Sequence, residues 1–432
     1  MGIKIAVIGA GSSYTPELFS NLVDTSLVLD VERVVLMDID GERASFIAQV
    51  SRKLLAGKGK DIQIVATSDR RGAIAEADFI ILQIRVGGLA GRIRDEKLPM
   101  EFGLVGNETT GAGGFISALR TLQVVLDIAR DVERYAPHAW LMNLSNPAGI
   151  ITEALLKHSQ VRVIGFCNIP INTQYAFAEA LGVPAASIRL DSFGLNHLSW
   201  VREVYVAGEA VLQPLIKAAY SRESALYQHG LVESLIDPSW LQTLRMIPGW
   251  YLRYYYYPEA ILNEDRLRPR SDGEDDLLAE QKLHQIYSTE GYHDDARQIL
   301  ADKGGAQYYL PVLQTIESIV NDRGDVIICD VRNGGTLSDL PPDACVEVPA
   351  RIYREGVESL TVGPMPEFVR GLVQSVKAYE ELTIQAAING DPRLAVAALA
   401  TNPLVGSVGV ARAFFERALV SEGPTLRQFL SR

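Results

Sequence analysis

Two residues of the types that bind transition metals, Cys167 and His197, each stand directly beside an asparagine. Cys167 precedes Asn168 in G-F-C-N-I-P, and His197 follows Asn196 in F-G-L-N-H-L-S-W. Both motifs follow strand-like runs, so one thiolate and one imidazole could meet in one cleft with positions open for substrate oxygens. Such a pair favours a divalent transition-metal site. The alternative is that Cys167 is a small buried hydrophobic residue and His197 a hydrogen-bonded core histidine.

A glycine turn near the N-terminus has the composition of a dinucleotide-binding site. Gly9 and Gly11 follow the apolar run from Lys4 to Ile8, and Pro16 is typical of the first turn of a helix. Glycines allow the backbone to approach a pyrophosphate, and the helix start offers free N–H groups to it. Tyr14 stands where the usual fingerprint has its third glycine. A strand-to-helix turn in a protein that binds no nucleotide remains the alternative.

An acidic residue at the end of the second predicted strand supports the dinucleotide hypothesis. Asp38 follows the apolar run from Val34 to Met37, where a carboxylate is placed to bind the ribose hydroxyls of adenosine. This favours NAD over NADP. Asp40 is its nearest competitor for that role.

The elements that would position these residues alternate between strands and helices over about the first 170 residues. This alternation predicts an α/β fold with an N-terminal Rossmann-type doubly wound parallel sheet. We expect residues 1–170 to form the NAD-binding domain. We expect residues 171–432 to form a mixed, largely helical domain for substrate binding, metal binding and oligomerisation. The strands are expected at Lys4–Ile8, Val34–Met37, Phe79–Gln83, Trp140–Asn143 and Val161–Gly165.

The second half shows a less regular pattern. Leu212–Tyr287 is rich in helical signals and tyrosines, and a polar break at Arg266–Asp276 suggests a mobile loop. Helices are expected at Phe368–Asn389 and Pro392–Ala400. We expect this half to pack on the first as a substrate lid and an oligomer surface.

Composition excludes several classes of function. The net charge of -12 lacks the clustered Lys and Arg of a nucleic-acid surface. Three widely spaced cysteines make a disulfide framework improbable. We find no secretory leader and no apolar run of about 18 residues that could span a bilayer. A cytoplasmic enzyme with no membrane partner is therefore expected.

The motifs together resemble glycoside hydrolase family 4, in particular its 6-phospho-β-glucosidase branch. The resemblance runs from the N-terminus to V-K-A-Y-E-E-L-T-I-Q-A-A and N-P-L-V near the C-terminus. Family 4 consists of NAD-dependent glycosidases that depart from the usual paired-carboxylate mechanism. The segments that carry the resemblance are G-S-S-Y-T-P-E-L, L-Q-I-R-V-G, R-I-R-D-E, E-T-T-G-A-G-G, N-L-S-N-P-A-G, F-C-N-I-P, G-L-N-H and I-P-G-W-Y-L-R-Y-Y-Y.

The resemblance implies cofactors and a substrate. NAD and Mn²⁺, or another divalent transition metal, would be the cofactors. A phosphorylated disaccharide or aryl glycoside would be the substrate, cleaved by oxidation, elimination, water addition and reduction to release glucose 6-phosphate. A homodimer or homotetramer is expected.

The resemblance also implies roles for individual residues. Tyr251 would be the catalytic base, with Tyr254 and Tyr255 as alternatives one turn away. Asn168, which follows the metal-binding cysteine, would also be a catalytic residue. The metal ligands would be Cys167 and His197; the NAD-binding residues Gly9, Gly11, Ser12, Ser13 and Asp38; and the substrate-binding residues Arg92, Asn107, Glu108, Asn146 and Asn168.

Three positions qualify the resemblance. Asn107 stands where the branch usually has Gln, and a second phosphate-binding arginine has only Arg268 and Arg270 as candidates. In the α-specific branch the residue after the metal-binding cysteine is typically Asp, whereas Asn168 cannot donate a proton as a general acid. This difference favours β-linked substrates.

Two alternatives from other classes share the first half of the chain. One is an NAD-dependent 2-hydroxy acid dehydrogenase, which needs a His paired with an Asp and an arginine for the substrate carboxylate. The other is a nucleotide-sensing protein without turnover. A Cys167–Asn168 pair with His197 fits the glycosidase better than the dehydrogenase, and hydrolysis of an aryl glycoside phosphate would exclude the nucleotide-sensing protein.

Overall fold

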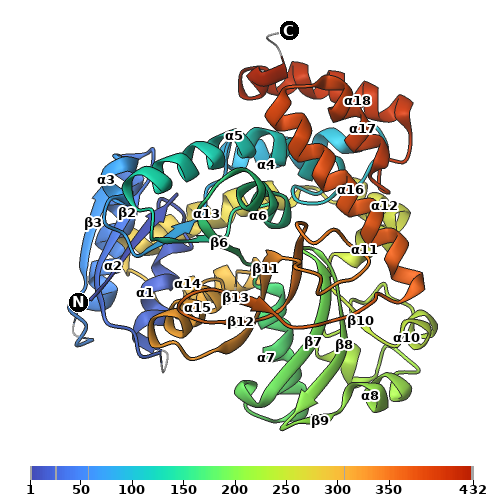
Figure 1. Ribbon diagram of the computed structural model, residues 1–432, viewed down its shortest axis with the longest axis horizontal. Helices are drawn as coiled ribbons and strands as arrows, with labels where there is room; N and C mark the ends of the chain where they lie inside the picture. The colour runs from blue at the N-terminus through green and yellow to red at the C-terminus, as the bar shows by residue number, and fades with distance from the viewer. Residues whose placement is uncertain (1, 25–26, 57, 306, 430–432) are drawn as a thin grey trace.

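The computed structural model describes residues 2–24, 27–56, 58–305 and 307–429, and its centre is a large twisted sheet (Figure 1). Within these residues the sheet has nine strands, in the order β13-β12-β11-β6-β5-β4-β1-β2-β3. The six strands from β6 to β3 pair in parallel, in the Rossmann order, which confirms the predicted doubly wound sheet. They are β1 (Ile3–Ile8), β2 (Val31–Met37), β3 (Gln63–Thr67), β4 (Phe79–Leu82), β5 (Trp140–Asn143) and β6 (Arg162–Gly165).

The second half of the chain extends this sheet rather than only covering it. β11 (Asp325–Arg332) pairs antiparallel with β6, β12 (Cys345–Ile352) with β11, and β13 (Val357–Ser359) with β12. One hydrophobic core runs through residues of both halves. The division of the chain near residue 170 stays a prediction.

A smaller antiparallel sheet carries the predicted histidine. β7 (Ile188–Leu195) and β8 (Leu198–Val206) form a tight hairpin, and β9 (Glu209–Ala210) and β10 (Ile247–Pro248) pair with β8. Leu195 pairs with Leu198, so Asn196 and His197 form the whole turn between the strands. β7 lies against β12, which joins the small sheet to the large one.

Helices cover the sheets and connect their strands. In Figure 1 the helices α16, α17 and α18 lie together at the upper right, above the small sheet. In the first half the helices are α1 (Thr15–Asp24), α2 (Gly41–Leu55), α3 (Arg70–Ile74), α4 (Gly88–Met100), α5 (Gly111–Tyr135), α6 (Ala148–His158) and α7 (Ile169–Leu181). Those that follow are α8 (Leu212–Ala218), α9 (Ala225–Gln228), α10 (Pro238–Leu244), α11 (Leu252–Tyr256), α12 (Pro258–Leu267), α13 (Asp272–Thr289), α14 (Asp294–Asp302), α15 (Leu310–Asn321), α16 (Glu367–Asn389), α17 (Pro392–Thr401) and α18 (Val408–Glu422).

One sequence-based expectation was wrong. The suggested mobile loop at Arg266–Asp276 is mostly helical, because Ser271 and Glu274 form a capping box that starts α13 at Asp272. The chain also contains a helix, α5, that is long and apolar enough to cross a membrane. Its most apolar window is 83% buried inside the protein, so α5 is a core helix.

A buried ion network joins α5 to the helices on either side of it. Arg120 donates hydrogen bonds to Asp95 on α4, at 3.0 Å, and to Glu422 on α18, at 3.1 Å. The side chains of Arg120, Asp95 and Glu422 are almost fully buried. Because α4 also carries Arg92, this network helps to fix the helix that delivers a predicted substrate residue.

We expect Arg120→Ala to destabilise the fold strongly, since it leaves the buried Asp95 without its ion-pair partner and leaves Glu422 with Arg94 alone. Breaking a buried ion pair in this way costs about 3–5 kcal/mol. Arg130→Ala is the matched control, because Arg130 pairs with Asp127 on the exposed face of the same helix, where a pair contributes about 0–1 kcal/mol. Urea unfolding of both variants measures the difference. Equal losses of stability would contradict this account of the network.

Candidate functional site

The thiol of Cys167 and the imidazole of His197 meet in one pocket. Cys167 follows β6 and precedes α7, while His197 lies in the β7–β8 turn. Cys167 Sγ and His197 Nε2 are 3.5 Å apart. His197 has a φ of +62°, a conformation that is uncommon for residues other than glycine. The side chains that line the pocket are those of Cys167, Ile169, His197, Ser199, Trp250, Tyr251 and Glu347, and the backbone of Gly249 completes it.

A short relay fixes which nitrogen of His197 carries its proton. Asn107 Nδ2 donates to Tyr254 at 3.1 Å, which orients the amide and leaves its oxygen to accept from the Thr109 hydroxyl at 3.0 Å. The Thr109 hydroxyl therefore accepts from His197 Nδ1, which lies 3.1 Å away. The lone pair of Nε2 then faces Cys167. An outer partner of this kind is typical of a histidine that binds a metal.

The charge state of the pair also fits a cation. Burial lowers the pKa of His197 to about 3, so its imidazole is neutral near pH 7. Burial raises the pKa of the Cys167 thiol, and the nearby carboxyl of Glu347 raises it further. A cation in contact with the sulfur would reverse this effect and favour the thiolate.

The ligand set is incomplete by itself. Among the described residues no group of three or more His, Cys, Asp and Glu side chains is arranged to hold a metal. A cation bound by Cys167 and His197 would therefore keep positions for other ligands, as a catalytic metal does. The residues present fit such a metal.

Of the three candidate tyrosines, Tyr251 is the one that lines this pocket. Its ring stacks on His197 with ring centres 3.7 Å apart and planes 9° apart. Tyr254 accepts the hydrogen bond from Asn107, and Tyr255 packs against the large core. Burial raises the pKa of Tyr251 well above its usual range, and Glu108 raises it further. In the protein alone Tyr251 is thus harder to ionise than a free tyrosine.

Arg92 lies in a cluster of acidic side chains. Its guanidinium contacts Glu96 at 2.7 Å and Glu108 at 3.2 Å, and it also contacts Asp276, which pairs with Lys303. All of these side chains are largely buried, so the cluster is a strong local constraint.

The two other candidate arginines differ from Arg92 in their surroundings. Arg268 and Arg270 are partly exposed and pair with acidic residues at the start of α13, including Asp275 at 2.6 Å from Arg270. Nothing in these contacts distinguishes one of them as the second phosphate ligand.

The predicted asparagines are engaged with the protein to different degrees. Both the nitrogen and the oxygen of the Asn107 amide form hydrogen bonds within the protein, since the oxygen also accepts from the backbone N–H groups of Thr109 and Thr110. Asn168 stands at the N-cap position of α7 without a capping hydrogen bond from its side chain, and its amide nitrogen donates to the carbonyl of Gly304. Asn146 lies at the start of α6 and accepts from the backbone of Ala148 at 3.3 Å. As sugar ligands, all of them stay predictions.

The glycine turn has a geometry that requires glycine. Gly9 has a φ of +92°, and a Cβ there would lie 2.6 Å from the carbonyl oxygen of Gln83. The backbone N–H of Gly11 donates to Asp38 at 2.8 Å. Ser12 accepts from the backbone of Tyr14 at 3.3 Å, within the same turn. Because no side chain intervenes at this turn, a pyrophosphate could approach its backbone closely.

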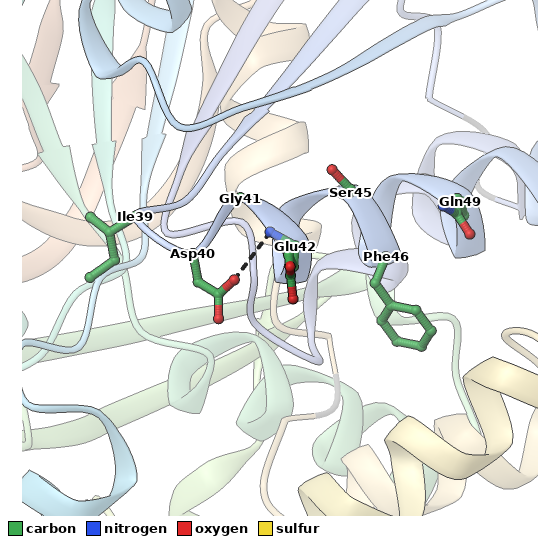
Figure 2. Close-up of a pocket in the computed structure, with 7 residues that line it drawn as sticks. All are labelled: Ile39, Asp40, Gly41, Glu42, Ser45, Phe46 and Gln49. Carbon is green, nitrogen blue, oxygen red and sulfur yellow. Dashed lines mark hydrogen bonds between the residues drawn. The ribbon is translucent and has the colours of Figure 1, made fainter.

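Asp38 and Asp40 have different roles. Asp38 lies beside the glycine turn, whereas Asp40 caps α2 by accepting from the backbone of Glu42 and Arg43 at 3.1 Å. Figure 2 shows Asp40 at the start of this helix, with its bond to the backbone of Glu42. The hollow that it borders is lined by Ile39, Asp40, Gly41, Glu42, Ser45, Phe46 and Gln49. Asp38 thus suits the predicted ribose contact better than Asp40 does.

Sequence reasoning missed two residues of the site. Thr109 lies inside the quoted E-T-T-G-A-G-G motif, but its role depends on the folded position of His197. Glu347 lies far along the chain, in the run C-V-E-V-P-A of β12. An acidic residue between valines in a buried strand was the available signal.

Comparisons with known proteins cover almost the whole chain. A model described as Family 4 glycosyl hydrolase matches residues 4–183, and one described as Family 4 glycosyl hydrolase C-terminal domain matches residues 192–405. A probable 6-phospho-beta-glucosidase of Bacillus subtilis is 35% identical over 100% of this chain and 99% of its own length. A phospho-alpha-glucosidase of Clostridium acetobutylicum is 30% identical, over 95% of each chain.

A solved structure is similar over its full length. It is that of the 6-phospho-beta glucosidase from Thermotoga maritima with manganese, NAD+ and glucose-6-phosphate. It is 30% identical, with a TM-score of 0.89 over 98% of this chain and 99% of the other.

The buried neutral imidazole predicts a dependence of stability on pH in the metal-free protein. The unfolded chain binds a proton on His197 near pH 6.5, while the folded chain does so only near pH 3. The contribution of this residue to stability is therefore present above pH 6.5 and is lost as the pH falls toward 3. Between these limits the loss is about 1 kcal/mol per pH unit.

His197→Asn, which tolerates a positive φ, should reduce this dependence. Urea unfolding at pH 6.5, 5.5 and 4.5, in the presence of a chelator, compares the variant with the wild type. The exposed His138→Asn serves as control and should keep the wild-type slope. An unchanged slope in His197→Asn would refute the burial argument.

Proposed function

The chain belongs to family 4 of the glycosyl hydrolases, and we propose that it hydrolyses 6-phospho-β-glucosides to release glucose 6-phosphate. It is an NAD- and manganese-dependent phospho-glycosidase of that family. Its preference for the β-linkage is the finer part of the proposal. Phosphorylated β-linked disaccharides such as phosphocellobiose, or aryl glycosides, are the substrates proposed.

The observation that carries the proposal is the pocket that joins Cys167, His197 and Tyr251. A dehydrogenase needs an acidic partner for its histidine, whereas in the described chain His197 Nδ1 faces the hydroxyl of Thr109. A stacked tyrosine over a Cys/His pair instead suits a reaction in which a metal would activate the sugar and the phenolate of the tyrosine would remove a proton from it.

We assign the cofactors to the two sites described above. NAD would bind along Gly9, Gly11, Ser12 and Ser13, with Asp38 at its ribose. Cys167 and His197 would hold the divalent cation. When bound, NAD would accept and return a hydride at the sugar, and the cation would act as a Lewis acid toward the sugar oxygens.

Tyr251 is the residue that we propose removes the proton from the C2 carbon of the sugar. Its phenol is buried beside Glu108, which disfavours the phenolate, so a nearby positive charge is needed to bring its pKa down. The stack on His197 places the tyrosine next to the proposed cation site. The proposed base, Tyr251, thus depends on the cation that His197 would hold.

Arg92, with Asn146 at the start of α6, is proposed to bind the substrate. Arg92 already contacts Glu96, Glu108 and Asp276, one from each guanidinium nitrogen, so a phosphate that binds it would use the two remaining N–H donors or displace a carboxylate. Asp276 comes from α13, a different part of the chain, and exchange of this partner would couple phosphate binding to that helix. A planar guanidinium suits either anion.

Several further predictions accompany this function. A cytoplasmic location, a homodimer or homotetramer, and a boundary between domains near residue 170 stay predictions. The alternative of a nucleotide-sensing protein without turnover is disfavoured by family membership, and any measured turnover of a phosphorylated aryl glycoside dismisses it.

We expect Tyr251→Phe to lose much of its rate, because a general base contributes about 10²–10⁴-fold. Binding of NAD should be unchanged, since the glycine turn is elsewhere. Tyr254→Phe is the matched control: this neighbouring phenol accepts from Asn107, and its loss should reduce the rate less. Product formed in D₂O by the wild type should carry deuterium at C2. Product without deuterium would show that C2 proton removal is not part of the reaction.

The anomeric preference rests on Asn168. The resemblance places a general acid at this position in the α-specific branch, and an amide cannot act as one. We therefore expect strong activity on β-linked and at most weak activity on α-linked substrates. A relative named as a phospho-alpha-glucosidase is 30% identical to this chain, so overall similarity does not decide the question.

The test compares kcat/KM for matched α- and β-nitrophenyl glucoside 6-phosphates, with NAD, Mn²⁺ and reductant. Substrates without the 6-phosphate are the control for Arg92 and should be poor. Turnover of the α-anomer as fast as the β-anomer, or faster, would end the β assignment. Asn168→Asp then asks whether a carboxyl group at this position increases activity on the α-anomer.

A further inference from the structure

A buried glutamate from the second half of the chain holds both ends of the histidine turn. Glu347 lies on β12, and its side chain is almost fully buried. One of its carboxylate oxygens accepts from Asn196 Nδ2 at 3.1 Å, and the other accepts from Ser199 Oγ at 2.8 Å. Asn196 directly precedes His197, and Ser199 follows it by two positions. Glu347 therefore bonds to the chain on either side of the proposed metal ligand.

The turn that carries His197 needs support from outside itself. It consists of two residues, and His197 holds a positive φ that glycine would adopt more readily. Such a conformation persists where the surrounding structure imposes it. Thr109 and Tyr251 contact the imidazole ring, whereas Glu347 contacts the chain beside it.

The strand that carries Glu347, β12, is also linked to Cys167. Gly165, two residues before Cys167, pairs with Asp330 on β11, and Asp330 pairs with Glu347 on β12. These three residues form a row across three adjacent strands. At one end of the row is the strand that leads to Cys167, and at the other is the carboxylate that binds the His197 turn. The row therefore fixes the position of one proposed ligand relative to the other.

We propose that Glu347 is a positioning residue that sets His197 relative to Cys167 and so determines how tightly the site binds a divalent cation. This inference rests on the proposed metal site at these two residues. Glu347 lines the same pocket, so its carboxylate also adds negative charge beside the cation. Its bonds to Asn196 and Ser199 make it an outer partner rather than a ligand.

The neighbouring Asp330 separates positioning from the mere presence of a buried carboxyl group near the site. It is equally buried, and neither of its carboxylate oxygens has a hydrogen-bond partner among the described residues. Asp330→Asn changes a buried carboxyl in the same row without touching the histidine turn. Ser199→Ala does the reverse, because it removes one bond to Glu347 and leaves the charge.

The experiment measures binding of Mn²⁺ to chelator-stripped full-length protein, by the electron paramagnetic resonance signal of the free ion. Glu347→Gln should weaken binding by about 10–100-fold, the usual effect of losing an outer-shell partner. Ser199→Ala should weaken it less, and Asp330→Asn should change it little. Co²⁺ absorption reports the coordination geometry and should shift in Glu347→Gln. Thermal unfolding of each metal-free variant shows whether it is folded.

The possible results separate the inference from the function on which it rests. Cys167→Ser should lose most of its Mn²⁺ affinity, and wild-type affinity in that variant would overturn the metal site itself. Wild-type affinity in Glu347→Gln, with loss in Cys167→Ser, would overturn only the positioning role. Equal losses in Asp330→Asn and Glu347→Gln would overturn it too, because the loss of any buried carboxyl group near the site would then explain both. Should Glu347→Gln not fold, wild-type affinity and an unchanged Co²⁺ spectrum in Ser199→Ala would overturn the inference.

Discussion

The 3.5 Å approach of Cys167 to His197 is the constraint on which the rest of the site depends. The two residues come from different sheets, the mixed nine-stranded one and the small antiparallel one, so neither sheet can form the pair alone. β12 joins the two sheets, because it is a strand of the large sheet and lies against β7 of the small one. The position of Tyr251 follows from the same contact, since its ring stacks on the histidine.

The acidic groups around the pocket favour binding of a cation. Glu347, whose pKa burial raises to about 7, and Asp330, whose pKa burial also raises, both lie near the thiol of Cys167. A thiolate added to these groups would be expensive in a buried place without a positive charge. The pocket therefore favours a cation over an anion, and the arginine that would hold the phosphate lies in a cluster of its own.

Local patterns were enough to predict the parallel sheet and five of its six parallel strands, because each of these is a short apolar run with its own turn signals. The edge strand β3 was missed. The Cys167 and His197 motifs could be found for the same reason, as each follows such a run. Long-range pairing could not be predicted: nothing near Asp325–Arg332 indicates that β11 pairs with β6. The three carboxylates around Arg92 come from separate segments, and Glu347 acts only because β12 meets a distant hairpin. The prediction of a loop at Arg266–Asp276 was wrong because it relied on polar composition, whereas Ser271 caps a helix that begins at Asp272.

The pairing of β11 with β6 has a consequence for the newly made chain. A ribosome releases β6 roughly 160 residues before β11, so the backbone N–H and C=O groups along one side of β6 wait without a partner. An open strand edge of this kind is a template for pairing with other chains. Translation speed and chaperone binding over this interval thus bear on how much of the protein reaches its native state. The C-terminal strands close this edge, and expressing the N-terminal half by itself leaves it open.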